Sequence, residues 1–188
     1  EAERHARSGL VEKPDHPHFL FILALVKNRM AEYDSSVATL KQAAQMCDSS
    51  DAQLRVDIHD WLAQAYERKQ DYKAAVSELD IALQKDPSHA SSLITRGLVH
   101  IQLKQLDQAE ESFRRALAVE KNHALALVRL GYCKLLGNDH HEATNMFQRA
   151  LQQRCGTVAL PRSVKGSARI YMALSYTGQS DTEQALVQ

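Results

Sequence analysis

Small apolar residues recur along this chain at a fixed interval of 34 residues. Alanine occupies three positions at that spacing, and a second alanine follows each of them seven positions later. A bulky apolar residue falls four positions after the first alanine of each unit, at Leu79, Phe113 and Phe147. Self-similarity at this period predicts a repeat protein in which each unit is one supersecondary element. The alanines are Ala75, Ala109 and Ala143, then Ala82, Ala116 and Ala150.

The residues between these positions predict helices. No run of residues alternates between apolar and polar over the two-residue period of a strand. Asp71, Asp107 and Asp139 precede or open the expected second helices, where a short acidic side chain caps free backbone N–H groups. Pro14 and Pro87 fall between units, where proline ends one helix without interrupting another. We therefore expect an all-α chain.

One unit carries the most complete set of repeat residues, namely Leu62, Ala63, Tyr66, Ala75, Leu79, Ala82 and Pro87. This set resembles the tetratricopeptide repeat (TPR) family, whose pattern is W-x2-L-G-x2-Y, then A-x3-F, then P. The family's tryptophan is absent, since His59 occupies its position and Trp61 lies two residues later. The resemblance implies an all-α fold, a right-handed superhelical solenoid of antiparallel helix pairs (TPR-like).

The repeat register extends over nearly the whole chain, as one solenoid domain. In the first full unit Ser36 stands where alanine is expected. Because both end units are incomplete and Glu1 is not methionine, we expect a fragment of a longer TPR solenoid protein. The expected parts are the second helix of a truncated repeat at 1–16, a TPR-like repeat at 17–50, TPR repeats at 56–89, 90–123 and 124–157, an inter-repeat insertion at 158–165 and a partial TPR repeat at 166–188.

Charge and hydropathy exclude some partners. Acidic and basic side chains are equal in number, 23 of each, and the basic ones are scattered among the acidic ones. A protein that binds duplex nucleic acid shows a basic stripe, so we expect no nucleic acid partner. The longest apolar run, Phe19 to Val26, is much shorter than the roughly twenty residues that cross a bilayer. We expect no membrane insertion.

Cysteine usage bears on the compartment. The three cysteines, Cys47, Cys133 and Cys155, are odd in number and unrelated in spacing, which favours reduced thiols over a disulfide framework. The first residues also lack the features of a signal peptide. We therefore expect a cytoplasmic protein, and the nucleus or the cilium fits the same features.

The sequence offers no clear catalytic motif. It contains no phosphate-binding glycine loop, no H-E-x-x-H zinc helix and no paired cysteine motif with ligand spacing. Three polar clusters contain residue types that bind metals, and we interpret each cluster as structural. The clusters are Asp57 to Asp60 within a helix, His140 to Glu142 at a helix start, and Asp15 to His18 at a turn. We expect no enzyme activity, no cofactor and no metal in this chain.

A binding surface is the better candidate. The first helices of a TPR solenoid line its concave groove, so the resemblance implies which residues meet a partner. Apolar residues where a solvated groove would be polar indicate a buried partner. We expect an amphipathic helix or extended peptide of a protein partner, with Arg129 binding an acidic group. The groove residues are Ile94, Leu98, Ile101, Leu125, Val128, Arg129, Tyr132 and Leu135.

The apolar stripe has two alternative interpretations. Some of its side chains can contact the first helix of the next unit, as ordinary inter-repeat core, or a downstream part of the longer protein can fold back into the groove. The unit at 56–89 instead presents polar residues at the same positions, namely Asp57, Asp60, Gln64 and Glu67. The insertion is a second candidate contact surface, or else a slack joint between repeats.

One well-known TPR function is disfavoured. Cochaperones that hold the acidic C-termini of Hsp70 and Hsp90 resemble this fold and use a carboxylate clamp of Lys, Asn and Arg side chains. At the clamp positions this chain has Asp60, Gln64, Thr95, Leu125 and Arg129, of which only Arg129 matches. Ligand carboxylates would be poorly paired at such a site.

Two function classes are therefore expected. The first is a protein–protein interaction scaffold or adaptor within a larger multiprotein complex. The alternative is an accessory substrate-docking or partner-docking TPR domain of a larger enzyme. We favour the scaffold, because stacking or surface position accounts for every residue considered.

Overall fold

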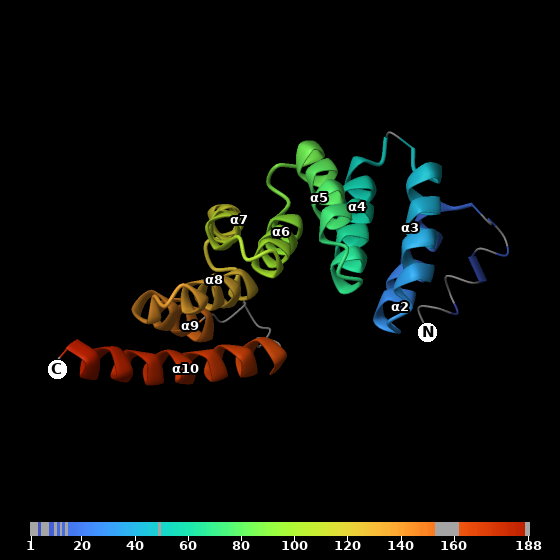
Figure 1. Ribbon diagram of the computed structural model, residues 1–188. Coiled ribbons are helices and arrows are strands. Elements are labelled where there is room, and N and C mark those ends of the chain that lie inside the picture. Colours follow the sequence, from blue (N-terminus) through green and yellow to red (C-terminus); the bar gives the residue numbers. More distant parts are fainter. Residues whose placement is uncertain are drawn as a thin grey trace. The chain divides into compact units, whose positions relative to one another are not determined.

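The structure is a computed structural model. It describes residues 15–48, 50–152 and 162–186, together with Arg4, Ser8, Gly9, Val11 and Lys13, and for residues 179–186 it describes the backbone alone. Within these residues all regular secondary structure is helical, as Figure 1 shows. The expected all-α fold is confirmed.

The chain divides into two compact units, Glu1–Thr95 and Arg96–Gln188, and each is described by itself. Unit 1 contains α2 (Pro17–Arg29), α3 (Tyr33–Met46), α4 (Ala52–Arg68) and α5 (Tyr72–Lys85). Unit 2 contains α7 (Leu106–Val119), α8 (Ala124–Leu136), α9 (His140–Gln152) and α10 (Arg162–Leu186). The division falls inside α6 (Ala90–Gln102).

Neighbouring helices pack in pairs within each unit. In unit 1, α2 packs against α3 and α4 against α5, while α3 also contacts α4. In unit 2, α8 packs against α7 and α9, and α10 contacts both α8 and α9. Figure 1 shows α10, in red, running beside α9.

Within the described part of the chain the same turn recurs four times, and each copy depends on one residue with positive φ. These residues are Ala31, Gln70, Lys104 and Asn138, with φ values of 62°, 61°, 60° and 60°. The next residue donates its backbone N–H to a carbonyl in the last turn of the preceding helix, at 2.9 Å for Asp71 to Tyr66 and for Asp139 to Lys134. Both aspartates then cap the following helix through their side chains.

Glycines in the first helices of unit 2 allow close packing. A Cβ atom built on Gly97 would lie 2.5 Å from the ring of Phe113, and one on Gly131 would lie 2.6 Å from the ring of Phe147. Both rings are fully buried. The 34-residue repeat of a small residue opposite a bulky one therefore reflects a steric requirement.

Two core positions of unit 1 hold polar residues that are satisfied internally. The buried Ser36, which stands in an alanine position, donates its hydroxyl to the backbone carbonyl of Ala24 at 2.9 Å. His59, at the position of the family tryptophan, has its Nδ1 2.7 Å from Oε2 of Glu78. These contacts replace apolar packing between paired helices.

The end of the chain differs from the sequence expectation. The register at 166–188 predicts a first helix and the start of a second, whereas α10 is one helix of 25 residues. No proline interrupts it. Residues 162–165 of the expected insertion form the first turn of α10, while 158–161 lie outside the described residues. Most of the helix expected at 1–16 also lies outside them.

Candidate protein-binding surface

The eight predicted groove residues lie on α6 and α8. Ile94, the one member in unit 1, is buried, and so is Val128 on α8. The other six are half-buried. We call these six the first-helix surface of unit 2: Leu98, Ile101, Leu125, Arg129, Tyr132 and Leu135.

Tyr132 has an intramolecular contact. Its ring centroid lies 4.9 Å from that of Tyr171 on α10, and the planes are tilted by 32°. Tyr171 also approaches Phe147 on α9, with centroids 5.8 Å apart. Aromatic pairs at these distances stabilise helix packing. The geometry therefore supports the alternative in which Tyr132 and the buried Val128 belong to the core between repeats and not to an open groove.

Arg129 is the cation of this surface. Its Nε atom is buried and has no hydrogen-bond partner in the structure, and no described residue forms an ion pair with its guanidinium. A buried N–H group without an acceptor is energetically costly, so an incoming carboxylate would be favoured there.

The sequence interpretation missed two apolar residues on α10. Ile170 is 62% exposed and Leu174 is 52% exposed. They follow Val128 and Tyr132 by 42 residues, which is one repeat plus the eight residues of the expected insertion. Extending the register across that insertion would have identified both as first-helix positions. They are exposed because, among the described residues, no further helix packs over them.

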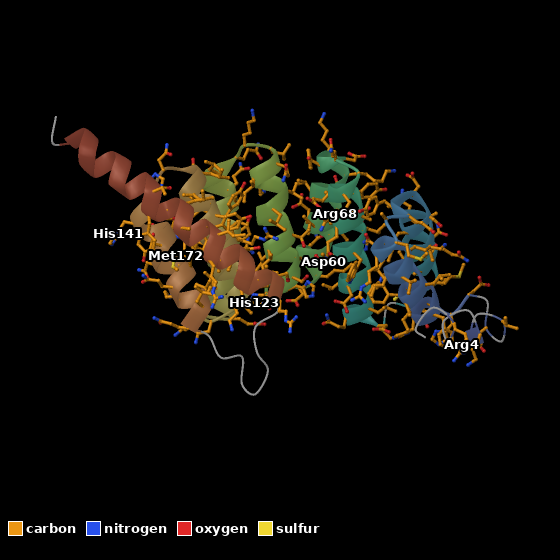
Figure 2. All side chains as sticks on the ribbon, turned by 90° about the horizontal axis from the view of Figure 1, so that it is seen from below. Arg4, Asp60, Arg68, His123, His141 and Met172 are labelled. Carbon is orange, nitrogen blue, oxygen red and sulfur yellow. The ribbon has the colours of Figure 1, made fainter. Side chains whose placement is uncertain are left out.

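The first-helix face of unit 1 differs from the acidic surface expected for it. Asp60, labelled on α4 in Figure 2, is only 2% exposed. Its carboxylate accepts hydrogen bonds from Ser91 Oγ at 2.6 Å, Gln64 Nε2 at 3.0 Å and Thr95 Oγ1 at 3.2 Å. Asp60 is therefore a satisfied buried group and not a groove residue, because hydroxyl groups from α6 complete its hydrogen bonding. Asp60 and Thr95 bond to each other, so neither is available as a clamp residue.

A charged cluster joins three helices of unit 2. Nζ of Lys134 on α8 lies 2.9 Å from Oε1 of Glu110 on α7 and 2.9 Å from Oε2 of Glu142 on α9. The hydrogen bond to Glu110 is the main cause of a raised pKa of Lys134. Beside it, burial raises the pKa of the Cys133 thiol to about 11. The Cys133 thiol donates to the backbone carbonyl of Leu106 over 3.4 Å.

The polar clusters noted in the sequence have structural contacts. Glu142 pairs with Lys134, and Nε2 of His18 lies 3.3 Å from a carboxylate oxygen of Asp51. In the described part of the chain, no three His, Cys, Asp or Glu side chains are grouped to hold a metal ion. Nor does any described helix combine the length and the apolar character that a bilayer crossing requires.

Two similar proteins are peptidyl-prolyl cis-trans isomerases named FKBP4. The human protein is 26% identical over 127 residues, which is 65% of this chain and 26% of that protein. The Bos taurus protein is 26% identical over 136 residues, covering 68% of this chain and 29% of that protein. The matched part of the chain thus spans less than a third of either relative.

Solved structures show the same fold at low identity. TTC0263, a thermophilic TPR protein of Thermus thermophilus, superposes with a TM-score of 0.75 at 22% identity, over 93% of this chain and 89% of that one. YrrB, described as a TPR protein with an unusual peptide-binding site, gives 0.64 at 20% identity, over 96% and 87%. The APC/C hetero-tetramer Cut9–Hcn1 gives 0.77 at 15% identity, over 92% and 32%.

A family model described as tetratricopeptide repeat matches residues 61–121 and 94–158, together more than half of the chain. The family model and the structural neighbours both agree with a TPR fold built of helix pairs. The resemblance to this family is confirmed, and it supports the general role of a protein–protein interaction scaffold. The chain belongs to the tetratricopeptide repeat family.

Proposed function

We propose that unit 2 binds a helix or an extended peptide of a partner protein along its first-helix surface. One observation carries this proposal: the Nε atom of Arg129 is buried and has no hydrogen-bond partner, on a face whose other residues are apolar or aromatic. Apolar contact would supply affinity, and Arg129 would supply selectivity for an acidic group. In this proposal the chain and its partner are both parts of a larger multiprotein complex.

Screening peptides against unit 2 variants tests the surface. Peptides selected against the wild-type chain are measured against Leu98→Glu/Leu135→Glu, which places carboxylates on the surface. Val119→Glu is the matched control, because Val119 is an exposed apolar residue at the end of α7. We expect the double variant to lose the peptides and the control to keep them. Equal binding to both would refute the proposal, provided that circular dichroism shows equal helicity.

Arg129→Gln tests the ionic part separately. We expect weaker binding of acidic peptides and a smaller salt dependence, because one charge pair is lost. Unchanged affinity and unchanged salt dependence would remove Arg129 from the binding surface.

Thiol chemistry supports a reducing compartment such as the cytoplasm. Cys47 and Cys133 are both buried and free. Neither has a cysteine partner among the described residues. Fractionation of cells that express the full-length protein tests this location.

An accessory docking domain of a larger enzyme is the second candidate. It is favoured by the lengths of the two isomerases, of which the matched region is 26% and 29%. Isomerase activity of the full-length protein, measured with and without residues 1–188, tests this candidate. A full-length protein without isomerase activity would refute the version in which the larger enzyme is an isomerase.

A further inference from the structure

The exposed side of α10 combines apolar and basic residues. Ile170 and Leu174 are one helical turn apart and are both mainly exposed. Lys165 and Arg169 form a second row with the same spacing and are also exposed. No acidic residue occurs between Arg162 and Ser180. In a chain with no net charge, this helix is locally cationic.

Helical geometry places the two rows side by side. Successive residues are rotated by about 100° around the axis, so side chains three and four positions apart are neighbours. Ala173 is therefore adjacent to both Arg169 and Ile170, and it joins the basic row to the apolar row. The packed side of α10 is a different one, marked by the buried Ala168 and Ser175 and by the Tyr171 ring.

Among the described residues, the cations of this helix have no ion-pair partner. No described acidic side chain forms an ion pair with Arg162, Lys165 or Arg169. On α7 and α8, by contrast, Arg114 and Lys134 both pair with Glu110. An acidic partner would therefore supply the charge complementarity that the described residues do not provide on this side of α10.

We propose that this side of α10, defined by Lys165, Arg169, Ile170, Ala173 and Leu174, docks an amphipathic helix of a partner protein whose apolar stripe is bordered by acidic residues. The small Ala173 allows close approach of a helix, the two large apolar residues supply buried contact, and the basic row fixes orientation. This inference rests on the proposed function, because it extends the first-helix surface of unit 2 onto the next helix.

The observations favour a protein helix over a lipid surface. An interfacial membrane helix presents a long apolar face, whereas α10 exposes only two large apolar residues in this row. The basic row and the apolar row of α10 run in parallel over the same length, so they match an amphipathic helix with one acidic stripe and one apolar stripe.

Two synthetic helical peptides provide the probes. They share one apolar stripe, which is flanked by glutamate in the first and by lysine in the second. At low salt we expect the wild-type chain to bind the glutamate peptide about tenfold more tightly than the lysine peptide. Lys165→Glu/Arg169→Glu is expected to reverse that preference, and Lys165→Gln/Arg169→Gln to abolish it. The control is Lys104→Glu/Lys121→Glu, which reverses two exposed charges elsewhere in unit 2 and is expected to change nothing.

Several outcomes would overturn the inference. Equal affinity for both peptides, no binding of the glutamate peptide, or an equal effect of the control would each do so. Binding to phosphatidylserine vesicles that the glutamate peptide does not compete for would assign the row to a lipid surface instead. A concentration-dependent dimer that Leu174→Asp abolishes would assign it to a second copy of the chain.

The proposed function fails separately. Glutamate-peptide binding that is lost in Leu98→Glu/Leu135→Glu but kept in Leu174→Asp would overturn the α10 inference and leave the first-helix surface intact. Binding lost in Leu174→Asp but kept in the Leu98→Glu/Leu135→Glu variant would remove the first-helix surface of unit 2 as the binding site and leave the α10 side as the docking site. Equal circular dichroism spectra of all variants are required for either conclusion.

Discussion

Tyr132 on α8 and Tyr171 on α10 pack ring against ring, with centroids 4.9 Å apart. Phe147 on α9 contacts the same Tyr171 ring at 5.8 Å. One aromatic side chain of α10 thus binds to both helices of the preceding pair. This contact explains how a helix that follows residues 153–161 is held in unit 2.

Replacing Tyr171 should loosen α10 selectively. Tyr171→Ala removes both ring contacts, and we expect it to destabilise the attachment of α10 by about 2–3 kcal/mol. Hydrogen exchange of the α10 backbone amides measures this, with α4 as an internal reference because it lies in unit 1. Tyr171→Phe keeps both rings and should change little. Equal protection of α10 in Tyr171→Ala and wild type would contradict the importance of the contact.

Two glycine substitutions with the same chemistry should have opposite effects. Gly131→Ala places a Cβ atom 2.6 Å from the Phe147 ring, and we expect a loss of about 1–3 kcal/mol in unfolding free energy. Gly166→Ala meets no atom within 4 Å in α10, so the helix should gain about 0.5–1 kcal/mol from reduced backbone entropy in the unfolded chain. Urea denaturation measures both. A stabilising Gly131→Ala would show that the two helices can separate at little cost.

The period of the sequence predicts the helix pairs well, because close packing of Gly131 on Phe147 imposes the spacing directly. The candidate site is predicted less well. The repeat register places Asp60 on a polar groove, but its burial depends on hydroxyl groups 31 and 35 positions away, at Ser91 and Thr95. No local sequence pattern links Ser91 and Thr95 to Asp60, so the sequence alone does not predict that Asp60 is buried.

The expectation for Tyr132 shows the same limit. Its partner Tyr171 lies beyond the expected insertion, where the period is interrupted, so the sequence leaves both an open groove and an inter-repeat core possible. Ile170 and Leu174 occupy the unit positions of Val128 and Tyr132 once the register restarts at 166, but their exposure depends on which helices pack against α10, and the sequence does not give that. The role of Arg129 stays a prediction that the geometry supports, because its Nε atom has no hydrogen-bond partner.

The Lys134 cluster predicts a pH-dependent stability difference. Lys134 is 14% exposed and pairs with Glu110 and Glu142, and we expect Lys134→Met to lose about 1 kcal/mol at neutral pH. A raised folded-state pKa means that this stabilisation is complete below the unfolded value of about 10.4 and is lost as the pH rises through the folded value. Urea denaturation from pH 7 to 11 measures it.

The free energies of unfolding of wild type and Lys134→Met should differ by a constant amount up to about pH 10 and converge above that pH. Lys121→Met is the matched control, because Lys121 is exposed. A difference that persists unchanged at pH 11, or one shared by the control, would attribute the effect to side-chain packing instead of charge.

The Cys133 thiol should be nearly unreactive in the folded protein. Burial raises its pKa from 9.0 to about 11, so the thiolate fraction at pH 8 falls about a hundredfold. In a Cys47→Ser/Cys155→Ser background, DTNB should label Cys133 slowly in buffer and rapidly in urea, where the thiol regains its ordinary pKa. Because the same thiol donates to the Leu106 carbonyl at the start of α7, the labelling rate also reports separation of α7 from α8. Rapid labelling in buffer, with helicity retained, would show that these two helices part frequently in the native state.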